Sequence, residues 1–266
     1  MTLRPVLLSL LLATGPLALP AMAEESGATH GEVAEMTKAE HAVWTRLLAS
    51  YVQEGTDGVT RVYYAALKAN AADRSTLDTY IASFVNRDLS GTDAAAFAAW
   101  ANLYNAVTVR HIVERYPLGS IRDGYLFGGP WKKVKVIADG REVSLDAIEH
   151  DILRKRFNDP RVHYAINCAS YSCPNLLPKA WEAATLDADL DAAARAYVNH
   201  PRGVDPGRNG LTVSSIYDWF EDDFGGSRSA VIDHLLTYAD DTLAEEIRAN
   251  PKIRSYDYDW SLNGTE

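Results

Sequence analysis

The chain has 266 residues, and its 36 acidic side chains against 26 lysines and arginines give it a net charge of −10. An acidic chain without a concentrated basic stretch is a poor nucleic-acid binder, so we expect no nucleic-acid partner. With only two cysteines it is not a disulfide-rich scaffold, and a conventional hydrophobic core must stabilise it.

The N-terminus has the pattern of a secretory signal. Arg4 precedes the apolar run VLLSLLLATGPLALPAMA, and acidic residues follow directly after Ala23. A basic start, a short apolar core and small residues at its end predict a signal peptide over residues 1–23, cleaved after Ala23. The glycine and two prolines within the run argue against a membrane-spanning helix. We therefore expect a periplasmic or secreted protein that does not contact the membrane after cleavage.

The first half of the remaining chain has mainly helical patterns. Residues 24–40 are polar and predict a loose lead-in, and residues 41–85 have helical spacing that the turn-like stretch EGTDG interrupts. Residues 93–116 give the clearest helix, which should end before Pro117. The stretch WKKVKVIADGREVSL predicts a hairpin that turns at Asp139-Gly140.

The second half adds short elements of both kinds. Ser144 can cap a helix over residues 145–157, and RVHYAIN, residues 161–167, has the composition of a short strand. The remaining predicted elements are a helix near 186–199, a strand at 211–213, and helices at 215–222 and 228–249. Together these patterns predict one α+β domain over residues 41–266, mostly helical, with a small antiparallel sheet.

His163 is the first candidate for chemistry. If residues 161–167 form a strand, Arg161, His163 and Asn167 share one face, and Cys168 lies on the opposite face. The shared face is either a cleft, where Arg161 and Asn167 would contact substrate, or the solvent side, where His163 would be a surface or structurally hydrogen-bonded residue. This placement makes Cys168 a poor partner for His163.

The second cysteine has a different setting. Cys173 follows a bend and precedes Pro174, and proline favours the first position of a helix. Cys173 would then lie at the N-cap, where the helix dipole favours the thiolate. The alternatives are a Cys168–Cys173 disulfide, a redox-active pair without the usual C-x-x-C spacing, and a metal site, for which the usual ligand spacings are absent.

Glu149 is the third candidate. It shares a helix face with apolar residues, and a carboxylate in such a place needs a partner. The partner is either an arginine, which would make Glu149 structural, or a histidine, whose ring a carboxylate would orient for proton transfer. The candidate arginines are Arg154, Arg161 and Arg110.

Two asparagines in the long predicted helix form the last candidate group. Asn102 and Asn105 share a helix face, with Tyr104 beside them. Asparagine is unfavourable inside helices and is seldom buried without partners. These side chains either fix neighbouring backbone or line a substrate pocket, where their amides could stabilise an oxyanion.

These motifs together resemble the family named domain of unknown function 547. The resemblance covers about residues 95–262 and rests on FAAWANLYNAVTVRHIVERYP, VSLDAIEHDILR, DPRVHYAINCASYSCP, SIYDWFEDDFG and YDWSLN, in that order. It implies one domain of that family in an exported bacterial protein. The family's IEH, RVH and SCP motifs suggest a distant cysteine-hydrolase-like arrangement of Glu149, His163 and Cys173.

Two functions therefore follow as predictions. In the first, an exported thiol-dependent hydrolase or acyl transferase uses Cys173 as nucleophile, His163 as base and Glu149 to orient His163, and it acts on an amide, peptide or thioester carbonyl. In the second, a non-catalytic domain binds a ligand and carries a Cys168–Cys173 disulfide. Either function involves a small-molecule or peptide partner, and neither requires a cofactor or a metal ion.

Overall fold

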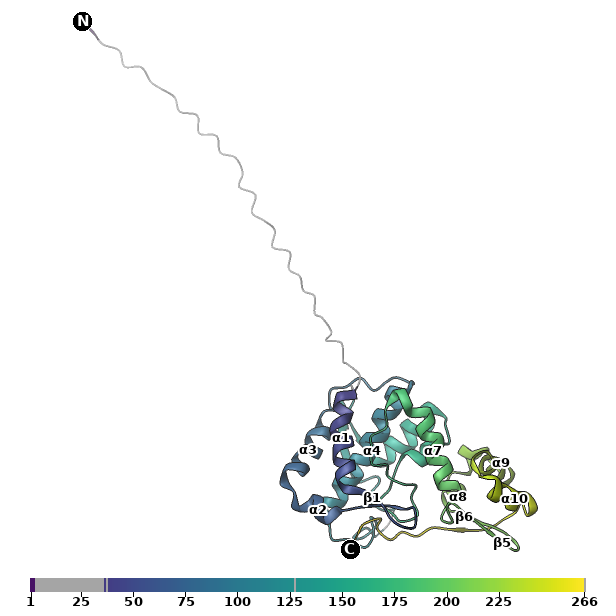
Figure 1. Cartoon of the computed structure of the whole chain (residues 1–266). Coiled ribbons are helices and arrows are strands. Elements are labelled where there is room, and N and C mark those ends of the chain that lie inside the picture. The colour runs from purple at the N-terminus through teal and green to yellow at the C-terminus, as the bar shows by residue number, and fades with distance from the viewer. Residues whose placement is uncertain (3–35, 37, 127, 266) are drawn as a thin grey trace. The chain divides into compact units, whose positions relative to one another are not determined.

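The structure is a computed structural model that describes residues 1–2, 36, 38–126 and 128–265. All but residues 1–2 of the predicted signal peptide, and most of the predicted lead-in, lie outside the described residues. The fold described here is that of the unit that begins at residue 33 (Figure 1).

The unit has the mixed α+β fold that the sequence predicts. The α-helices are α1 (Lys38–Tyr51), α2 (Tyr64–Ala69), α3 (Ala71–Ala82), α4 (Ala94–Arg115), α5 (Arg154–Phe157), α6 (Val162–Ala165), α7 (Leu186–Val198), α8 (Ile216–Trp219), α9 (Arg228–Tyr238) and α10 (Asp241–Ala249). A π-helix, η1, spans Ala147–Leu153, and 3-10 helices span Ala183–Thr185 (η2) and Glu221–Phe224 (η3). The strands are β1 (Val52–Glu54), β2 (Thr60–Val62), β3 (Lys135–Ala138), β4 (Arg141–Ser144), β5 (Val204–Gly207), β6 (Gly210–Ser214) and β7 (Ile253–Asp257).

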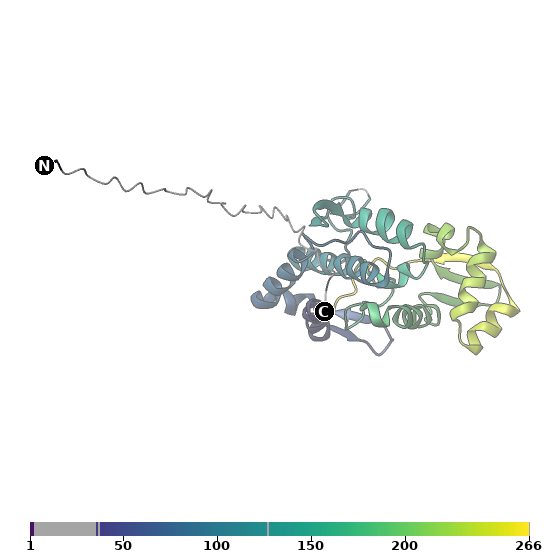
Figure 2. The same cartoon turned by 90° about the horizontal axis from the view of Figure 1, so that it is seen from above.

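The long helix α4 forms the centre of the main core. The Asp93 side chain accepts a hydrogen bond from the N–H of Ala96 at 2.9 Å, which caps the helix. The helix ends at Arg115, before Pro117, as predicted. Its residues are buried almost all round, as expected of a helix that is apolar on every side. It packs against α2, α3 and η1 (Figures 1 and 2).

The strands form small separate sheets. The predicted hairpin β3–β4 is confirmed, and Asp139 and Gly140 at its turn have φ of 52° and 67°, as a type I′ turn requires. The strands β1 and β2 form a further antiparallel hairpin, and the stretch EGTDG, which was expected only to interrupt the helical spacing of residues 41–85, connects them. In the third sheet β5 and β6 are antiparallel, and β7 adds a parallel strand to β6.

The strand predicted over residues 161–167 is wrong. The structure has the short helix α6 here, because the Asp159-Pro160 pair starts a helical turn: the Asp159 carboxylate accepts the Arg161 N–H at 2.9 Å. The β-branched and aromatic composition of this stretch reflects burial against α7 and not pairing with another strand. Cys168 and His163 therefore do not lie on opposite faces of a strand, contrary to the prediction.

A second hydrophobic cluster lies around the C-terminal elements. It joins α7, α9, α10 and the β5–β6–β7 sheet, which Figure 2 draws together in green and yellow. The helix predicted over 228–249 is two helices, α9 and α10, which separate at residues 239–240. In the described part of the chain, no helix has the combined length and apolar character needed to cross a bilayer.

We expect Asn102→Ala to lower the free energy of unfolding by about 2–4 kcal/mol. The Asn102 amide donates to the Trp181 carbonyl and accepts from the Trp181 N–H, both at 2.9 Å, so the substitution leaves two buried backbone groups unpaired. As a control, Asn250→Ala, which removes an exposed bond to the Arg208 carbonyl, should cost about 0.5 kcal/mol or less. Urea denaturation measures both, and equal losses in the two variants would contradict the assignment.

Candidate functional site

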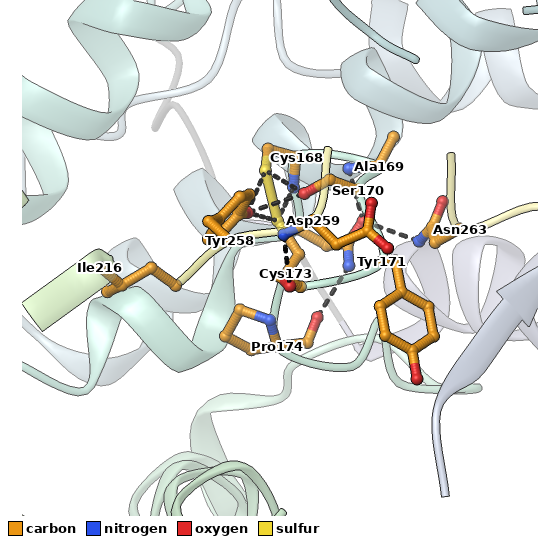
Figure 3. The surroundings of a disulfide bond; sticks show 12 residues. Cys168, Ala169, Ser170, Tyr171, Cys173, Pro174, Ile216, Tyr258, Asp259 and Asn263 are labelled. Carbon is orange, nitrogen blue, oxygen red and sulfur yellow. Dashed lines mark hydrogen bonds between the residues drawn. A yellow bond between two sulfur atoms is a disulfide. The ribbon is translucent and has the colours of Figure 1, made fainter. Parts of the chain in front are cut away.

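The two cysteines form a disulfide. The Cα atoms of Cys168 and Cys173 lie 6.2 Å apart, and neither cysteine is free (Figure 3). Ala169, with φ of 60°, reverses the chain just after Cys168 and brings the two side chains to the same side. The predicted N-cap position of Cys173 is wrong, because no helix begins at Pro174. In this form Cys173 has no thiol, as the second predicted function expected.

Polar groups surround the disulfide closely. The N–H of Cys168 donates to Sγ of Cys173 at 2.9 Å, and the hydroxyl of Tyr258 lies 3.1 Å from each sulfur (Figure 3). The Ser170 hydroxyl is 2.7 Å from that of Tyr258. The Ser170 hydroxyl also lies 3.3 Å from Sγ of Cys168, so one backbone N–H and two hydroxyl groups are within reach of the sulfurs.

His163 is buried and its ring is held by a carboxylate that the sequence analysis did not single out. Nε2 lies 2.7 Å from Oδ2 of Asp223, and the ring stacks on Phe220 with 4.1 Å between centroids. Burial lowers the pKa of His163. Because ionised Asp223 has no proton to give, Nε2 carries the shared proton, and in the neutral ring Nδ1 is an acceptor.

Asp223 also forms a salt bridge with the guanidinium group of Arg154. Its two oxygens accept hydrogen bonds from Nε and Nη2 of Arg154 at 2.5 and 3.0 Å. Burial alone would raise the pKa of Asp223, but the bonds from His163 and Arg154 hold that pKa well below its usual range. Asp223, which lies in the motif SIYDWFEDDFG, therefore makes the carboxylate contact with His163 that was predicted for Glu149.

Glu149 lies on η1 and is buried, as its helix-face position predicted. The Ser144 hydroxyl accepts the Ala147 N–H at 3.1 Å and starts this segment, also as predicted. The hydroxyl of Tyr104 donates to Oε2 of Glu149 at 3.1 Å. Burial raises the pKa of Glu149 to about 7, although the Tyr104 bond opposes this rise. The carboxyl group can therefore gain or lose a proton near neutral pH.

A pocket of about 270 Å³ brings the chemical candidates together. Tyr104, Glu149, His163, Cys168 and Cys173 all line it. The lining residues that were not predicted include the ring-bearing side chains of Trp131, His150, Trp219, Phe220, Tyr258 and Trp260. All of these except Trp131 lie in motifs quoted for the family resemblance, so the signal was present, but no spacing connected these motifs in space.

The other predicted substrate-binding residues have structural partners. Asn102 holds the backbone of Trp181, and Asn105 donates to the Ala165 carbonyl and accepts from the Asn167 N–H, at 2.9 and 2.8 Å. Asn167 donates to the Pro174 carbonyl at 2.7 Å and accepts from the Ala169 N–H at 2.8 Å. Arg161 pairs with three carboxylates, those of Asp159, Asp187 and Asp191. These residues position the pocket and do not line it.

A metal site receives no support from the geometry. Within the ranges that the structure describes, no three His, Cys, Asp or Glu side chains are placed to hold a metal ion.

We expect Glu149→Gln to stabilise the protein increasingly as the pH rises. The pKa of Glu149 is about 7 in the folded protein, against an ordinary value of 4.5, so its stabilising contribution is complete below pH 4.5 and is lost as the pH rises through 7. The unfolding free energy of the variant minus that of the wild type should increase by about 3 kcal/mol between pH 4.5 and about pH 8. Urea denaturation across this range measures the difference.

The difference cancels the titration of groups that both proteins share, including the buried histidines. The matched control is Glu245→Gln, on the exposed side of α10, which should change the unfolding free energy by about 0.5 kcal/mol or less across this range. A flat difference for Glu149→Gln as well would contradict the assignment.

Comparisons with known proteins agree with the family resemblance. Residues 87–198 match the model of the family described as protein of unknown function, DUF547. This segment contains Glu149, His163 and both cysteines, whereas Asp223 and the aromatic residues after it lie outside, so the match is shorter than the 95–262 expected. No curated protein and no solved structure matched the chain. Through residues 87–198, the chain belongs to the DUF547 family of proteins of unknown function.

Proposed function

We propose that this domain binds a small molecule or a peptide segment in the pocket, and that a neutral, ring-bearing group of the ligand packs among its aromatic side chains. The observation that carries the proposal is the composition of the pocket, in which three tryptophans surround a protonatable carboxyl group and a disulfide. Pockets with apolar walls and a few convergent polar groups are the usual form of small-ligand sites.

The aromatic wall is suited to flat or ring-shaped groups. Trp219 stacks on Trp260 with 5.5 Å between centroids and 26° between planes, and Trp131 meets Trp260 at 69° and 5.7 Å. Trp219 is 47% exposed, which is unusual for a side chain of this size. Exposed tryptophan beside a pocket favours ligand contact, because its large rigid surface loses little entropy on binding.

The protonation state of Glu149 determines which polar groups of a ligand the pocket can accept. Below its pKa of about 7, the neutral carboxyl group can donate a hydrogen bond to a carbonyl, ether or hydroxyl oxygen of the ligand. Above that pH, the carboxylate puts a negative charge in an apolar pocket, which disfavours neutral ligands that accept hydrogen bonds. A neutral ligand with an acceptor oxygen therefore fits best.

A second candidate is the predicted thiol-dependent hydrolase or acyl transferase, active once the disulfide is reduced. It is favoured by one observation, that Cys173, His163 and Glu149 line the same pocket. In this mechanism Cys173 attacks a carbonyl, His163 takes its proton and later returns it to the leaving group, and Asp223 orients His163 in place of Glu149. Peptides, peptidoglycan cross-links, amides and thioesters are the candidate substrates.

Export to the periplasm or the medium is part of the proposal. It is supported by the signal-like pattern of residues 1–23 and by a disulfide, which persists best in an oxidising compartment. Mass spectrometry of the protein from fractionated cells should give an N-terminus at Glu24 outside the cytoplasm. Recovery of the uncleaved chain from the cytoplasm would contradict export.

We expect Trp219→Ala to weaken binding of a neutral ring-bearing probe, such as N-acetylphenylalaninamide, about tenfold. Titration calorimetry measures the affinity. The matched control is Ile137→Ala, which removes a side chain of similar exposure, 44%, on β3 outside the pocket and should leave the affinity unchanged. Equal affinities in the wild type and Trp219→Ala would rule out the pocket as the site.

The affinity of the wild type for the same probe should also fall as the pH rises through about 7, and Glu149→Gln should remove this dependence.

The hydrolase candidate predicts unequal cysteine reactivity after reduction. Iodoacetamide should not label the oxidised protein, because both sulfurs are bonded. In the reduced protein, Cys173 should be labelled faster than Cys168, and His163→Ala should slow this labelling about tenfold or more. His200→Ala, which changes a histidine outside the pocket, is the control. Equal, slow labelling of the two cysteines would exclude the thiol mechanism.

A further inference from the structure

We propose that the Cys168–Cys173 disulfide is a redox couple that exchanges with the thiol group of a ligand bound in the pocket. This inference rests on the proposed ligand pocket and adds to it the chemical class of the ligand, a thiol, and the reaction, oxidation of that thiol to a disulfide. Four observations carry it: the place of the disulfide, the support of its loop, the difference between its sulfurs, and a proton acceptor nearby.

The disulfide lines the pocket, and its loop is held independently of it. Residues 167–173, the cysteine loop, are fixed to the C-terminal segment by three backbone hydrogen bonds: Tyr171 N–H to Ser261 O at 2.7 Å, Ser172 N–H to Asp259 O at 3.2 Å, and Asn263 N–H to Ala169 O at 3.0 Å. Figure 3 shows the two segments side by side around the disulfide. A disulfide that closes so short a loop contributes only about 2 kcal/mol in the chain-entropy model. The loop can therefore keep its place when the bond opens.

The two sulfurs have different surroundings, and this difference gives the reaction a direction. Cys168 is partly exposed, whereas Cys173 is only 3% exposed. An incoming thiolate therefore reaches Sγ of Cys168 first, and Sγ of Cys173 is the leaving group. A leaving thiolate departs faster when nearby donors stabilise its charge.

Cys173 has those donors. The N–H of Cys168 points to its Sγ at 2.9 Å, and the hydroxyl of Tyr258 is 3.1 Å away. Tyr258 is equally close to both sulfurs. Sγ of Cys168 has in addition only the Ser170 hydroxyl, at 3.3 Å, so the shorter contact from the backbone N–H favours Cys173 as the leaving group. Burial raises the pKa of Tyr258, which keeps its hydroxyl protonated and able to donate.

A proton acceptor for the incoming thiol lines the same pocket. The carboxyl group of Glu149, with its pKa of about 7, is ionised in part at neutral pH and can take the proton of a bound thiol. A thiol must lose this proton before it attacks, since the thiolate is the nucleophile.

The reaction balances in two steps. A ligand thiolate attacks Sγ of Cys168, the ligand–Cys168 bond forms, and the Cys168–Cys173 bond breaks with its electron pair on Cys173. A second ligand thiolate then attacks the ligand sulfur of the mixed disulfide and releases Cys168. Two ligand thiols are oxidised to one disulfide and the protein disulfide is reduced to two thiols; the two protons that the ligand thiols lose pass, through Glu149 or solvent, to the two protein thiolates. A disulfide oxidant, such as glutathione disulfide, restores the couple by the reverse exchange.

The test compares the oxidised protein with an isolated oxidised peptide of residues 168–173, CASYSC, under the same concentration of thiol. Mass spectrometry after rapid alkylation measures the reduced fraction. We expect the protein to react about tenfold faster or more, because the pocket supplies the leaving-group donors that the peptide lacks. Equal or slower reaction of the protein would overturn the inference.

Two variant pairs test the assigned roles. With glutathione disulfide, Cys173→Ser should form a mixed disulfide at Cys168, whereas Cys168→Ser should form little at Cys173; the opposite order would overturn the direction. Tyr258→Phe should slow exchange about tenfold, and Tyr171→Phe, in the same loop but outside the pocket, should not. Equal rates in these two variants would remove Tyr258 from the mechanism.

Two thiol probes and one binding measurement separate the remaining outcomes. A higher rate with an unfolded two-cysteine peptide than with glutathione assigns the ligand as a peptide cysteine, and the reverse assigns a low-mass thiol. Binding of the neutral ring-bearing probe is measured on the same oxidised sample. Retained binding without fast exchange overturns this inference and leaves the ligand pocket standing, whereas loss of both overturns the two proposals together.

Discussion

The pairing of the C-terminal segment, residues 258–263, with the cysteine loop is the constraint on which the rest of the site depends. It carries Tyr258 to the sulfurs and places Trp260 in the pocket wall. The same segment continues to the first hairpin, where the Val62 N–H donates to the Asn263 carbonyl at 2.8 Å. Because these are backbone hydrogen bonds, they depend little on side-chain identity. The pocket is therefore closed by two segments whose paired residues lie 87 to 94 positions apart in the sequence but are adjacent in the fold.

The charges of the site are arranged around two carboxyl groups with opposite surroundings. Asp223 receives hydrogen bonds from Arg154 and His163, so it stays ionised and fixes the His163 ring. Glu149 is buried, and this burial makes it hold a proton up to about pH 7, although the Tyr104 hydroxyl donates a hydrogen bond to it. Environments that push two such pKa values apart are how proteins obtain an acid and a base from one residue type. The site thus combines the permanent negative charge of Asp223, which does not line the pocket, with the exchangeable proton of Glu149, which does.

The parts of this structure that depend on local sequence could be predicted, and those that depend on distant contacts could not. The helix α4 and the hairpin at Asp139-Gly140 follow from caps, breakers and turn residues that act over a few positions. The error at residues 161–167 arose because burial on several sides gives a short helix the composition of a strand. Glu149 was placed correctly on a buried face, but its partner was not, since nothing in the sequence spacing shows that Asp223 approaches His163. The aromatic wall was missed for the same reason.

The family match ends at residue 198, before the segment that supplies Asp223, Trp219 and Trp260. The matched segment supplies Glu149, the cysteines and part of the aromatic wall, including Trp131, and the residues that follow it supply the rest of that wall. The two parts touch through the His163–Asp223 hydrogen bond and the Trp131–Trp260 ring contact, so a substitution in either part changes the surroundings of the other.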